Sequence, residues 1–436
     1  IVGNPPWQSK ITDLAKHYID TNNKTIGDKQ IAQAFTIKCS SLCEKDGLIC
    51  LLMPSKGLLF NRSQPSSKYR QELFKNNIVY TIINLSVYRR NLFDHACGPA
   101  AVIIYSPNNQ LGDLQLNDDY QILYCTPKPR FSIEDDKKFS IDPTDICKLP
   151  SDLIHNDLIW KIAMWGNPRD LELIEKIQCT FPSFEIFIKD NDMISAEGYK
   201  RGNRETYCND FIDMPIIDAK FFPNTNPDLD TLDKVNFTDF ECIVSNKREI
   251  FKAPHLLIKQ SHKNGKFLSI VLNFDAAFNH SILGVHGDEN KLKYLSLIIG
   301  SRVFSFYHIL TNRKWLIERD ELEAGDIWTT PIPIPSEAEL AEAKALYDNY
   351  YLLNAVDQNI IEQYVRKMYR LYDYEGYLID DVIEYTFDYF QRKDKSKALI
   401  PAQAENYGMY YETLINALNN TLEQEIAFEG KLYKGN

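Results

Sequence analysis

Apolar residues follow two different patterns along the first 110 residues of the chain: helical spacing in some segments and continuous runs in others. Residues 29–44 carry apolar side chains at helical spacing, and residues 67–75 also fit a helix. Continuous apolar runs occupy residues 48–54, 78–85 and 100–106, and such runs are typical of strands buried on both faces of a parallel sheet. Strands and helices that follow one another so closely predict an α/β fold with a largely parallel sheet.

The pattern changes beyond residue 110. Residues 111–150 are rich in polar turns and prolines, which predicts a connector that runs over the surface. Residues 151–336 alternate short strands with short helices, and the repeated prolines at 330–335 predict an extended exit from this block. Ser336 fits a helix N-cap before an acidic first turn, so residues 337–436 are predicted to be almost wholly helical.

Composition narrows the class of protein. Of 436 residues, 44% are hydrophobic and 25% are charged, which is typical of globular chains. At roughly 150 residues per domain, this length predicts two to four domains. No apolar run approaches the ~18 residues that span a bilayer, so we expect no membrane partner. The cysteines include no CxxC pair, which predicts reduced thiols and a cytoplasmic location, and the histidines lack ligand spacing, which predicts no metal site.

Charge is distributed unevenly along the chain. The formal net charge is −11, which by itself argues against a protein that wraps nucleic acid. Residues 1–110, however, hold 13 Lys and Arg against 7 Asp and Glu, whereas residues 337–436 hold 10 against 18. The average therefore combines a basic N-terminal part with an acidic C-terminal part.

The sharpest chemical signal is Asn4-Pro5-Pro6-Trp7, directly after the apolar residues 1–3, which we interpret as the end of a buried strand. Two consecutive prolines stiffen the turn and remove backbone donors, so the Pro5 carbonyl becomes a rigid acceptor beside the Asn4 side-chain oxygen. Two neighbouring acceptors suit an exocyclic amino group, which has two N–H donors. Trp7 adds a flat face on which a heteroaromatic ring can stack, as the binding of a flipped adenine requires.

This motif resembles the Asp/Asn/Ser-Pro-Pro-aromatic motif of the N6-adenine DNA methyltransferases. Three more segments resemble later elements of that family in the same order: residues 46–59, 68–86 and 91–105. The last of them resembles a motif that places an aromatic residue against the flipped base. The resemblance therefore implies this role for Phe93, with a purely structural core aromatic as the alternative.

The resemblance implies the C-terminal part of a Rossmann-like methyltransferase sheet that depends on S-adenosylmethionine. It implies direct methyl transfer to N6 of a flipped adenine, with Asn4, Pro5, Pro6 and Trp7 as the catalytic motif. The family's main S-adenosylmethionine motif is expected upstream of Asn4, so the chain resembles a fragment and is expected to be inactive alone. The implied setting is a restriction–modification or phage-defence system, with double-stranded DNA and a restriction or specificity subunit as partners.

A second, looser resemblance lies in the middle of the chain. Residues 197–205 resemble the Gly-rich turn of target-recognition domains in these enzymes, residues 251–273 the strand pair that follows, and residues 291–310 the helix that closes the repeat. This implies four segments: a catalytic part (1–110), a connector (111–150), an α+β target-recognition domain (151–336) and an acidic helical segment (337–436).

Polar and cationic side chains of the recognition-like block can meet phosphates or base edges. Each of these cations is equally compatible with a solvated surface, and Asn203 equally fits a left-handed turn. The candidate DNA-binding residues are Lys200, Arg201, Asn203, Arg204, Lys259, Lys263, Lys266, Arg313 and Lys314.

Two alternative functions stay open at this point. The first is a sequence-specific DNA-binding module that is catalytically silent, which the missing cofactor half favours and the intact Asn4-Pro5-Pro6-Trp7 disfavours. The second is an RNA or protein methyltransferase, which the long recognition-like block disfavours.

Overall fold

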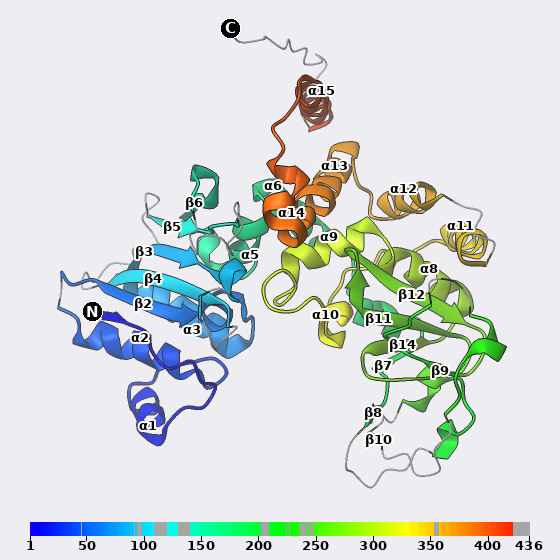
Figure 1. Cartoon of the computed structure of the whole chain (residues 1–436), viewed down its shortest axis with the longest axis horizontal. Helices are drawn as coiled ribbons and strands as arrows, with labels where there is room; N and C mark the ends of the chain where they lie inside the picture. Colours follow the sequence, from blue (N-terminus) through cyan, green and yellow to red (C-terminus); the bar gives the residue numbers. More distant parts are fainter. Residues whose placement is uncertain are drawn as a thin grey trace. The chain divides into compact units, whose positions relative to one another are not determined.

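The chain forms two compact units in the computed structural model (Figure 1). Unit 1 comprises Ile1–Glu172, His308–Asp320 and Arg392–Asp394, and unit 2 comprises Leu173–Tyr307, Glu321–Gln391 and Lys395–Asn436. The structure describes residues 1–44, 46–90, 92–93, 98–108, 120–129, 140–201, 209–223, 225, 227–235, 242–243, 247–352 and 357–421.

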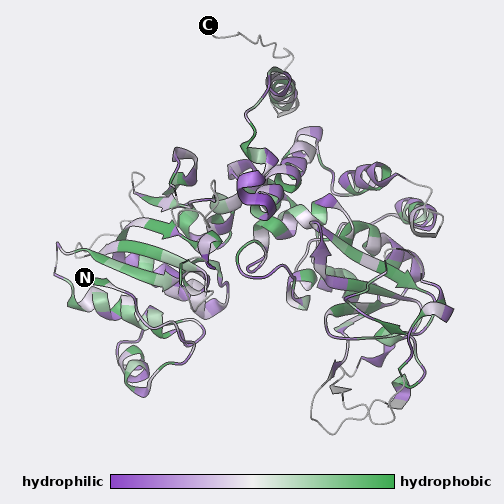
Figure 2. Cartoon of the chain, viewed as in Figure 1, coloured by the Kyte–Doolittle hydropathy of each residue, from purple (hydrophilic) through white to green (hydrophobic). Residues whose placement is uncertain are grey.

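A six-stranded sheet forms the centre of unit 1, in the order β1-β2-β4-β3-β5-β6. Its middle strands are mostly hydrophobic (Figure 2). Ile82 and Ile103 in these strands are fully buried. The three apolar runs of the sequence are therefore confirmed as strands. The strands are β1 (Val2–Gly3), β2 (Ile49–Pro54), β3 (Asn77–Asn84), β4 (Ala100–Pro107), β5 (Gln121–Cys125) and β6 (Ile146–Pro150).

The expectation of a largely parallel sheet is wrong. β1 runs parallel to β2 and β3 runs parallel to β5, but β4 is antiparallel to both β2 and β3, and β6 is antiparallel to β5. The sheet is therefore mixed. An apolar run reports that a strand is buried on both faces, and it says nothing about the direction in which the strand runs.

The segment expected to be a surface connector contributes two strands to this sheet. β5 and β6 lie within residues 111–150, and β5 pairs with β3 through Thr81, Ile82 and Ile83. The side chain of Tyr124 in β5 is fully buried. Alternation of exposed and buried residues over only five positions is a weak pattern, and the flanking prolines obscure it.

The helices of unit 1 confirm two expectations from the sequence. The helix expected at 29–44 is α2, which packs on β2 and β4, and the helix expected at 67–75 is α3, which packs on β3. α3 carries Pro65 in its first turn, where no intrahelical donor is needed. The described helices that lie wholly in unit 1 include α1 (Asp13–Thr21), α2 (Ile31–Leu42), α3 (Gln64–Asn76) and α5 (Ile159–Trp165).

A segment distant in sequence, His308–Asp320, belongs to unit 1 rather than to the middle block. Trp315 is fully buried there, and the buried Lys161 ammonium donates to the carbonyls of Asn312 and Trp315, the latter at 2.8 Å. Burial and, to a smaller extent, the nearby Lys161 charge together lower the pKa of His308 to about 3, so the imidazole is neutral at pH 7. The compact units therefore differ from the four segments expected from the sequence.

Unit 2 contains an antiparallel sheet in the order β12-β11-β14-β7. β11 and β12 are the strand pair expected within 251–273, and the left-handed Asn264 and Gly265 join them, with φ of 51° and 82°. The rings of Phe211, Phe251 and Phe278 pack beneath, with centroids 4.7 Å apart in each neighbouring pair. The strands are β7 (Ile194–Glu197), β11 (His255–Lys263), β12 (Lys266–Leu272) and β14 (Ile282–His286), with the short pairs β8 (Lys200–Arg201) with β10 (Cys242–Ile243) and β9 (Ile216–Ile217) with β13 (Ala277–Phe278).

The single helix expected over 291–310 is two helices, because the chain turns at Gly300 and Ser301. The expected N-cap is confirmed: the Ser336 hydroxyl accepts from the Glu339 backbone N–H at 3.3 Å, and the Glu339 carboxylate accepts from the Ser336 backbone N–H at 2.8 Å. The remaining helices are α6 (Pro168–Thr180), α7 (Phe184–Asp190), α8 (Glu289–Ile299), α9 (Arg302–Thr311), α10 (Ala324–Trp328), α11 (Glu337–Tyr347), α12 (Gln358–Met368), α13 (Asp373–Asp381), α14 (Phe387–Arg392) and α15 (Ala404–Thr421). None of the helices in the described ranges is both long and apolar enough to cross a membrane.

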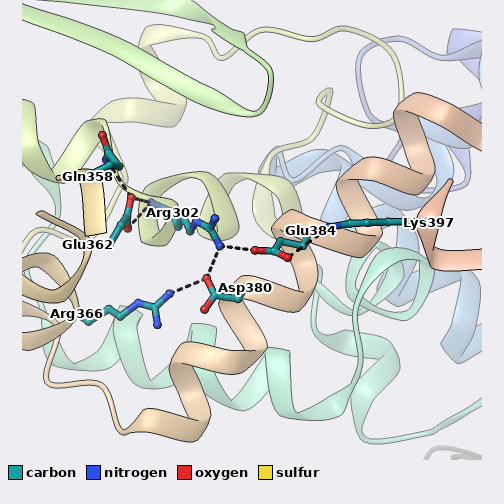
Figure 3. Close-up of polar contacts among 7 residues, drawn as sticks. All are labelled: Arg302, Gln358, Glu362, Arg366, Asp380, Glu384 and Lys397. Carbon is teal, nitrogen blue, oxygen red and sulfur yellow. Dashed lines mark hydrogen bonds and ion pairs between the residues drawn. The ribbon is translucent and has the colours of Figure 1, made fainter. Parts of the chain in front are cut away.

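Arg302, at the start of α9, connects the acidic helices to the rest of unit 2 (Figure 3). Its guanidinium lies 2.7 Å from Asp380 and 2.9 Å from Glu384, and Asp380 also accepts from Arg366 at 2.7 Å. The buried Glu362 carboxylate accepts from the Arg302 backbone N–H at 3.0 Å, as suits an anion at a helix N-terminus. Arg302 therefore balances part of the acidic charge of residues 337–436 inside unit 2.

We expect Arg302→Met to loosen this attachment, because Asp380 and Glu384 would then face each other without the shared cation. The network is only half-buried, so the expected loss is about 1–2 kcal/mol of local stability, seen as roughly tenfold faster amide hydrogen exchange in α13. Lys367→Met is the matched control, since Lys367 makes one exposed ion pair with Glu342 at 3.1 Å. Equal exchange rates in the two variants would contradict the role of Arg302.

Candidate active site

The position of the Asn4-Pro5-Pro6-Trp7 motif follows from the pairing of β1. Val2 pairs with Cys50 and Gly3 with Leu51, and the Ile1 carbonyl accepts from the Cys50 backbone N–H at 2.8 Å. Because β1 and β2 are parallel, the motif leaves the sheet at the edge where β2 also ends. The turn after β2 and the segment after β3, which carries Phe93, therefore begin at the same edge.

Asn4 and Pro5 present polar groups at this edge. Asn4 is exposed, whereas the Pro5 ring is buried and holds the turn against the sheet. Within the part of the chain that the structure describes, neither the Asn4 side chain nor the Pro5 carbonyl has a hydrogen-bond partner. The edge thus offers two adjacent acceptors to a donor from outside the protein.

Trp7 is held on three sides. Its indole Nε1 donates to the Leu52 carbonyl at 3.2 Å, and its ring meets the Phe93 ring edge-to-face, with centroids 5.4 Å apart and planes at 88°. A Cβ added at Gly98 would lie 3.2 Å from the Trp7 ring, so a glycine allows the close approach there. Trp7 and Phe93, far apart in sequence, therefore form one aromatic corner.

A buried polar network lies under the loop that carries Phe93. Asn84 Oδ1 accepts from the Ser86 backbone N–H at 3.1 Å and from its hydroxyl at 2.6 Å, and the Ser86 hydroxyl is 2.6 Å from that of Ser55. Asn84 Nδ2 donates to the Tyr124 hydroxyl at 2.8 Å, which donates to the Trp160 carbonyl at 2.8 Å. Burial raises the pKa of Tyr124, so its hydroxyl stays protonated and can act as a donor.

Two backbone hydrogen bonds close the same loop. The Ser55 N–H donates to the Pro99 carbonyl and the Leu85 N–H to the Ala100 carbonyl, each at 2.9 Å. Both ends of the loop are thus tied to the sheet. Sequence reasoning missed Asn84 and Ser86, although polar residues at the end of an apolar run are a signal because, once buried, they need hydrogen-bond partners.

The candidate DNA-binding residues lie on separate elements. Lys200 is exposed on β8, 3.3 Å from Glu197, and Lys259 and Lys263 lie on β11. Arg201 is placed by its backbone in β8, while Asn203 and Arg204 lie outside the described residues. In the Gly-rich turn, a Cβ at Gly198 would approach the Phe278 carbonyl to 2.2 Å, so only glycine fits.

Three of the candidate DNA-binding residues, Lys266, Arg313 and Lys314, do not lie where a recognition surface was expected. Lys266 donates from its ammonium to the Gln358 side chain at 2.7 Å and packs over the Tyr350 ring, and burial lowers its pKa. Arg313 and Lys314 lie in unit 1, within His308–Asp320. Sequence spacing could not anticipate either placement, because both depend on tertiary packing. Among the described residues, no group of three or more His, Cys, Asp or Glu side chains is arranged to hold a metal ion.

Comparison with known proteins gives one family match. Residues 1–93 match the Eco57I restriction-modification methylase family. The matched segment contains the Asn4-Pro5-Pro6-Trp7 motif and ends at Phe93, so it includes both rings of the aromatic corner. The match covers the N-terminal part of the chain and shows that this segment is similar to a restriction-modification methylase. A search of curated proteins finds no match to this chain.

Several solved structures are similar to a larger part of the chain, at low identity. They include a DrdV–DNA complex (10% identity, 82% of this chain and 45% of that chain, TM-score 0.43) and the type IIL restriction-modification enzyme MmeI in complex with DNA (11%, 90% and 57%, TM-score 0.41). The type IIG restriction endonuclease BpuSI is a third (12%, 88% and 53%, TM-score 0.32). The chain spans about half the length of these proteins, and scores this low carry no inference about its activity.

We expect Asn84→Ala to destabilise unit 1 by about 2–3 kcal/mol, because it leaves the buried Ser86 backbone N–H without its acceptor and removes one hydrogen bond from each of the buried Tyr124 and Ser86 hydroxyls. Chemical denaturation measures this loss. The control is Asn76→Ala, an exposed residue at the end of α3 for which we expect a change within roughly 0.5 kcal/mol. A variant at position 84 as stable as this control would show that the network does not support the loop.

Proposed function

We propose that this chain carries the catalytic motif and the DNA-recognition part of a site-specific DNA N6-adenine methyltransferase from a restriction–modification or phage-defence system. One observation carries the proposal. The Asn4 and Pro5 acceptors, which have no hydrogen-bond partner among the described residues, lie next to the Trp7–Phe93 corner, inside the segment that matches a restriction-modification methylase family.

The two acceptors suit the exocyclic amino group of adenine. The N6 lone pair is delocalised into the ring, so the free amino group is planar and a weak nucleophile. Hydrogen bonds from its two N–H groups to Asn4 Oδ1 and the Pro5 carbonyl favour a tetrahedral nitrogen whose lone pair points away from the protein acceptors. The rate then comes from orientation and from the stabilisation of developing positive charge on N6.

S-adenosylmethionine would supply an electrophilic methyl group. The Asn4 side-chain oxygen and the Pro5 carbonyl fit that chemistry, because they are hydrogen-bond acceptors and neither is a strong base. Transfer would form a carbon–nitrogen bond while the carbon–sulfur bond breaks with its electron pair on sulfur, and N6 would lose one proton to water. Asn4 and Pro5 therefore need only hold the amino group, and they need not remove a proton before the transfer.

The aromatic corner would hold the flipped base. Stacking of a base on an aromatic side chain stabilises it by about 1–3 kcal/mol, which offsets part of the few kcal/mol needed to extrude the base from the duplex. The perpendicular rings suit a base that stacks on one ring and meets the other edge-on. Trp7 is the better platform, since its hydrogen bond to Leu52 fixes the plane of the indole.

Recognition of the DNA sequence is assigned to unit 2. We propose that Lys200, Arg201, Lys259 and Lys263 contact phosphates or base edges, together with Asn203 and Arg204, which lie outside the described residues. We leave Lys266 out of this interface, because contact with DNA would break its hydrogen bond to Gln358.

The proposal is tested in a methylation-free bacterial host that expresses the complete reading frame containing this chain. Mapping of N6-methyladenine by single-molecule sequencing should reveal one methylated motif for the wild type. We expect Asn4→Ala to abolish the signal and Trp7→Ala to reduce the rate at least 100-fold, whereas Asn76→Ala should leave it unchanged. A well-expressed wild type that binds specific DNA but methylates none would favour the silent DNA-binding module instead.

A further inference from the structure

The loop formed by residues 311–320 is attached to unit 1 by side chains that are distant in sequence. Trp315 is fully buried, and the buried Lys161 ammonium donates to the carbonyls of Asn312 and Trp315. The Arg62 guanidinium donates to the Thr311 carbonyl. These anchors involve the core and the backbone, so the loop has one defined position in this unit.

The loop is also ordered internally. Asn312 Oδ1 accepts from the backbone N–H groups of Lys314 and Trp315, each at 2.7 Å. The Lys314 carbonyl accepts from the N–H of Ile317 at 3.0 Å and of Glu318 at 2.7 Å. Arg313 and Lys314 therefore lie in a rigid turn, with side chains that are partly exposed. A rigid backbone lowers the entropy that two long cationic side chains lose when they bind a ligand.

The loop adjoins the edge of the sheet that carries the catalytic motif. Lys56, in the turn directly after β2, forms an ion pair with Glu318 at 3.1 Å. The next residue of that turn, Gly57, accepts through its carbonyl from Gln33 of α2 at 2.9 Å. The start of α2 is in turn bonded to the segment after the motif, because the Ile31 N–H donates to the Gln8 carbonyl at 3.2 Å.

Charge indicates what this surface binds. The loop and the turn after β2 hold the cations Lys56, Arg62, Arg313, Lys314 and Arg319 against the anions Glu318 and Asp320, a net of +3 in a chain whose total is −11. A local excess of cations beside a site for a flipped base suits the DNA phosphates that flank that base.

We propose that the 311–320 loop is a phosphate-contacting element of the catalytic unit, in which Arg313 and Lys314 hold the DNA backbone next to the target base. The proposal rests on the proposed function and changes the role of these two residues, which sequence reasoning had placed in target recognition. Contacts to phosphates carry no base information, so the loop contributes affinity and position rather than sequence choice.

The test compares the full-length wild type with a double variant, Arg313→Gln and Lys314→Gln. Fluorescence anisotropy measures binding to a duplex with the recognised motif and to one without it, at salt concentrations between 50 and 200 mM. The logarithm of the binding constant falls with the logarithm of the salt concentration, and loss of two phosphate contacts makes this slope less steep by about 1.8. We expect equal weakening on both duplexes, so that their affinity ratio is unchanged.

Two control variants complete the experiment. Lys68→Gln with Lys75→Gln removes the same charge from exposed positions of α3 and should leave the slope unchanged. Arg313→Lys with Lys314→Arg keeps the charge and should bind with the wild-type slope. An unchanged slope in the Gln variant, an equal change in the α3 control, or a loss confined to the specific duplex would overturn the proposal for the loop alone. A wild type that binds neither duplex would overturn the proposed function as well.

Discussion

The parallel pairing of β1 with β2 is the constraint on which the candidate site depends. Only two residues, Val2 and Gly3, form β1, and the bond from the Cys50 N–H to the Ile1 carbonyl sets their register. A shift of one residue would turn the side chains over and move Asn4 away from the edge. Through this register, Trp7 reaches the Leu52 carbonyl and meets Phe93 from the other side of β2.

Buried or half-buried cations bring distant segments together in both units. Lys161 holds the 311–320 loop in unit 1, and Arg302 holds the acidic helices in unit 2. In each case the cation bonds to more than one oxygen, and these bonds offset the free energy that removing the charge from water requires. Within unit 2, Asp380 and Glu384 of the acidic C-terminal part share the Arg302 cation.

The sequence predicts local structure well where one physical rule dominates. Continuous apolar runs predicted β2, β3 and β4, and the Ser336–Glu339 capping box predicted the start of α11. The family resemblance singled out both the motif and Phe93, and the contact between the Trp7 and Phe93 rings is a finding of the structure. Strand direction, the pairing of β5 and β6 and the placement of Arg313 depend on packing between distant segments, so spacing alone could not predict them. The Asn84–Ser86–Ser55 network could not be predicted from the sequence either, because it forms only when the ends of β2 and β3 meet.

The central claim is that the edge of unit 1 holds a flipped adenine between Asn4, Pro5 and the aromatic corner. The most direct measurement is a structure of the full-length protein bound to a duplex that contains its methylated motif, with S-adenosylhomocysteine present. The account predicts an extruded adenine stacked on Trp7, with N6 about 3 Å from Asn4 Oδ1 and from the Pro5 carbonyl. A specific complex in which the target adenine stays stacked in the duplex, or in which its amino group faces other residues, would contradict the account.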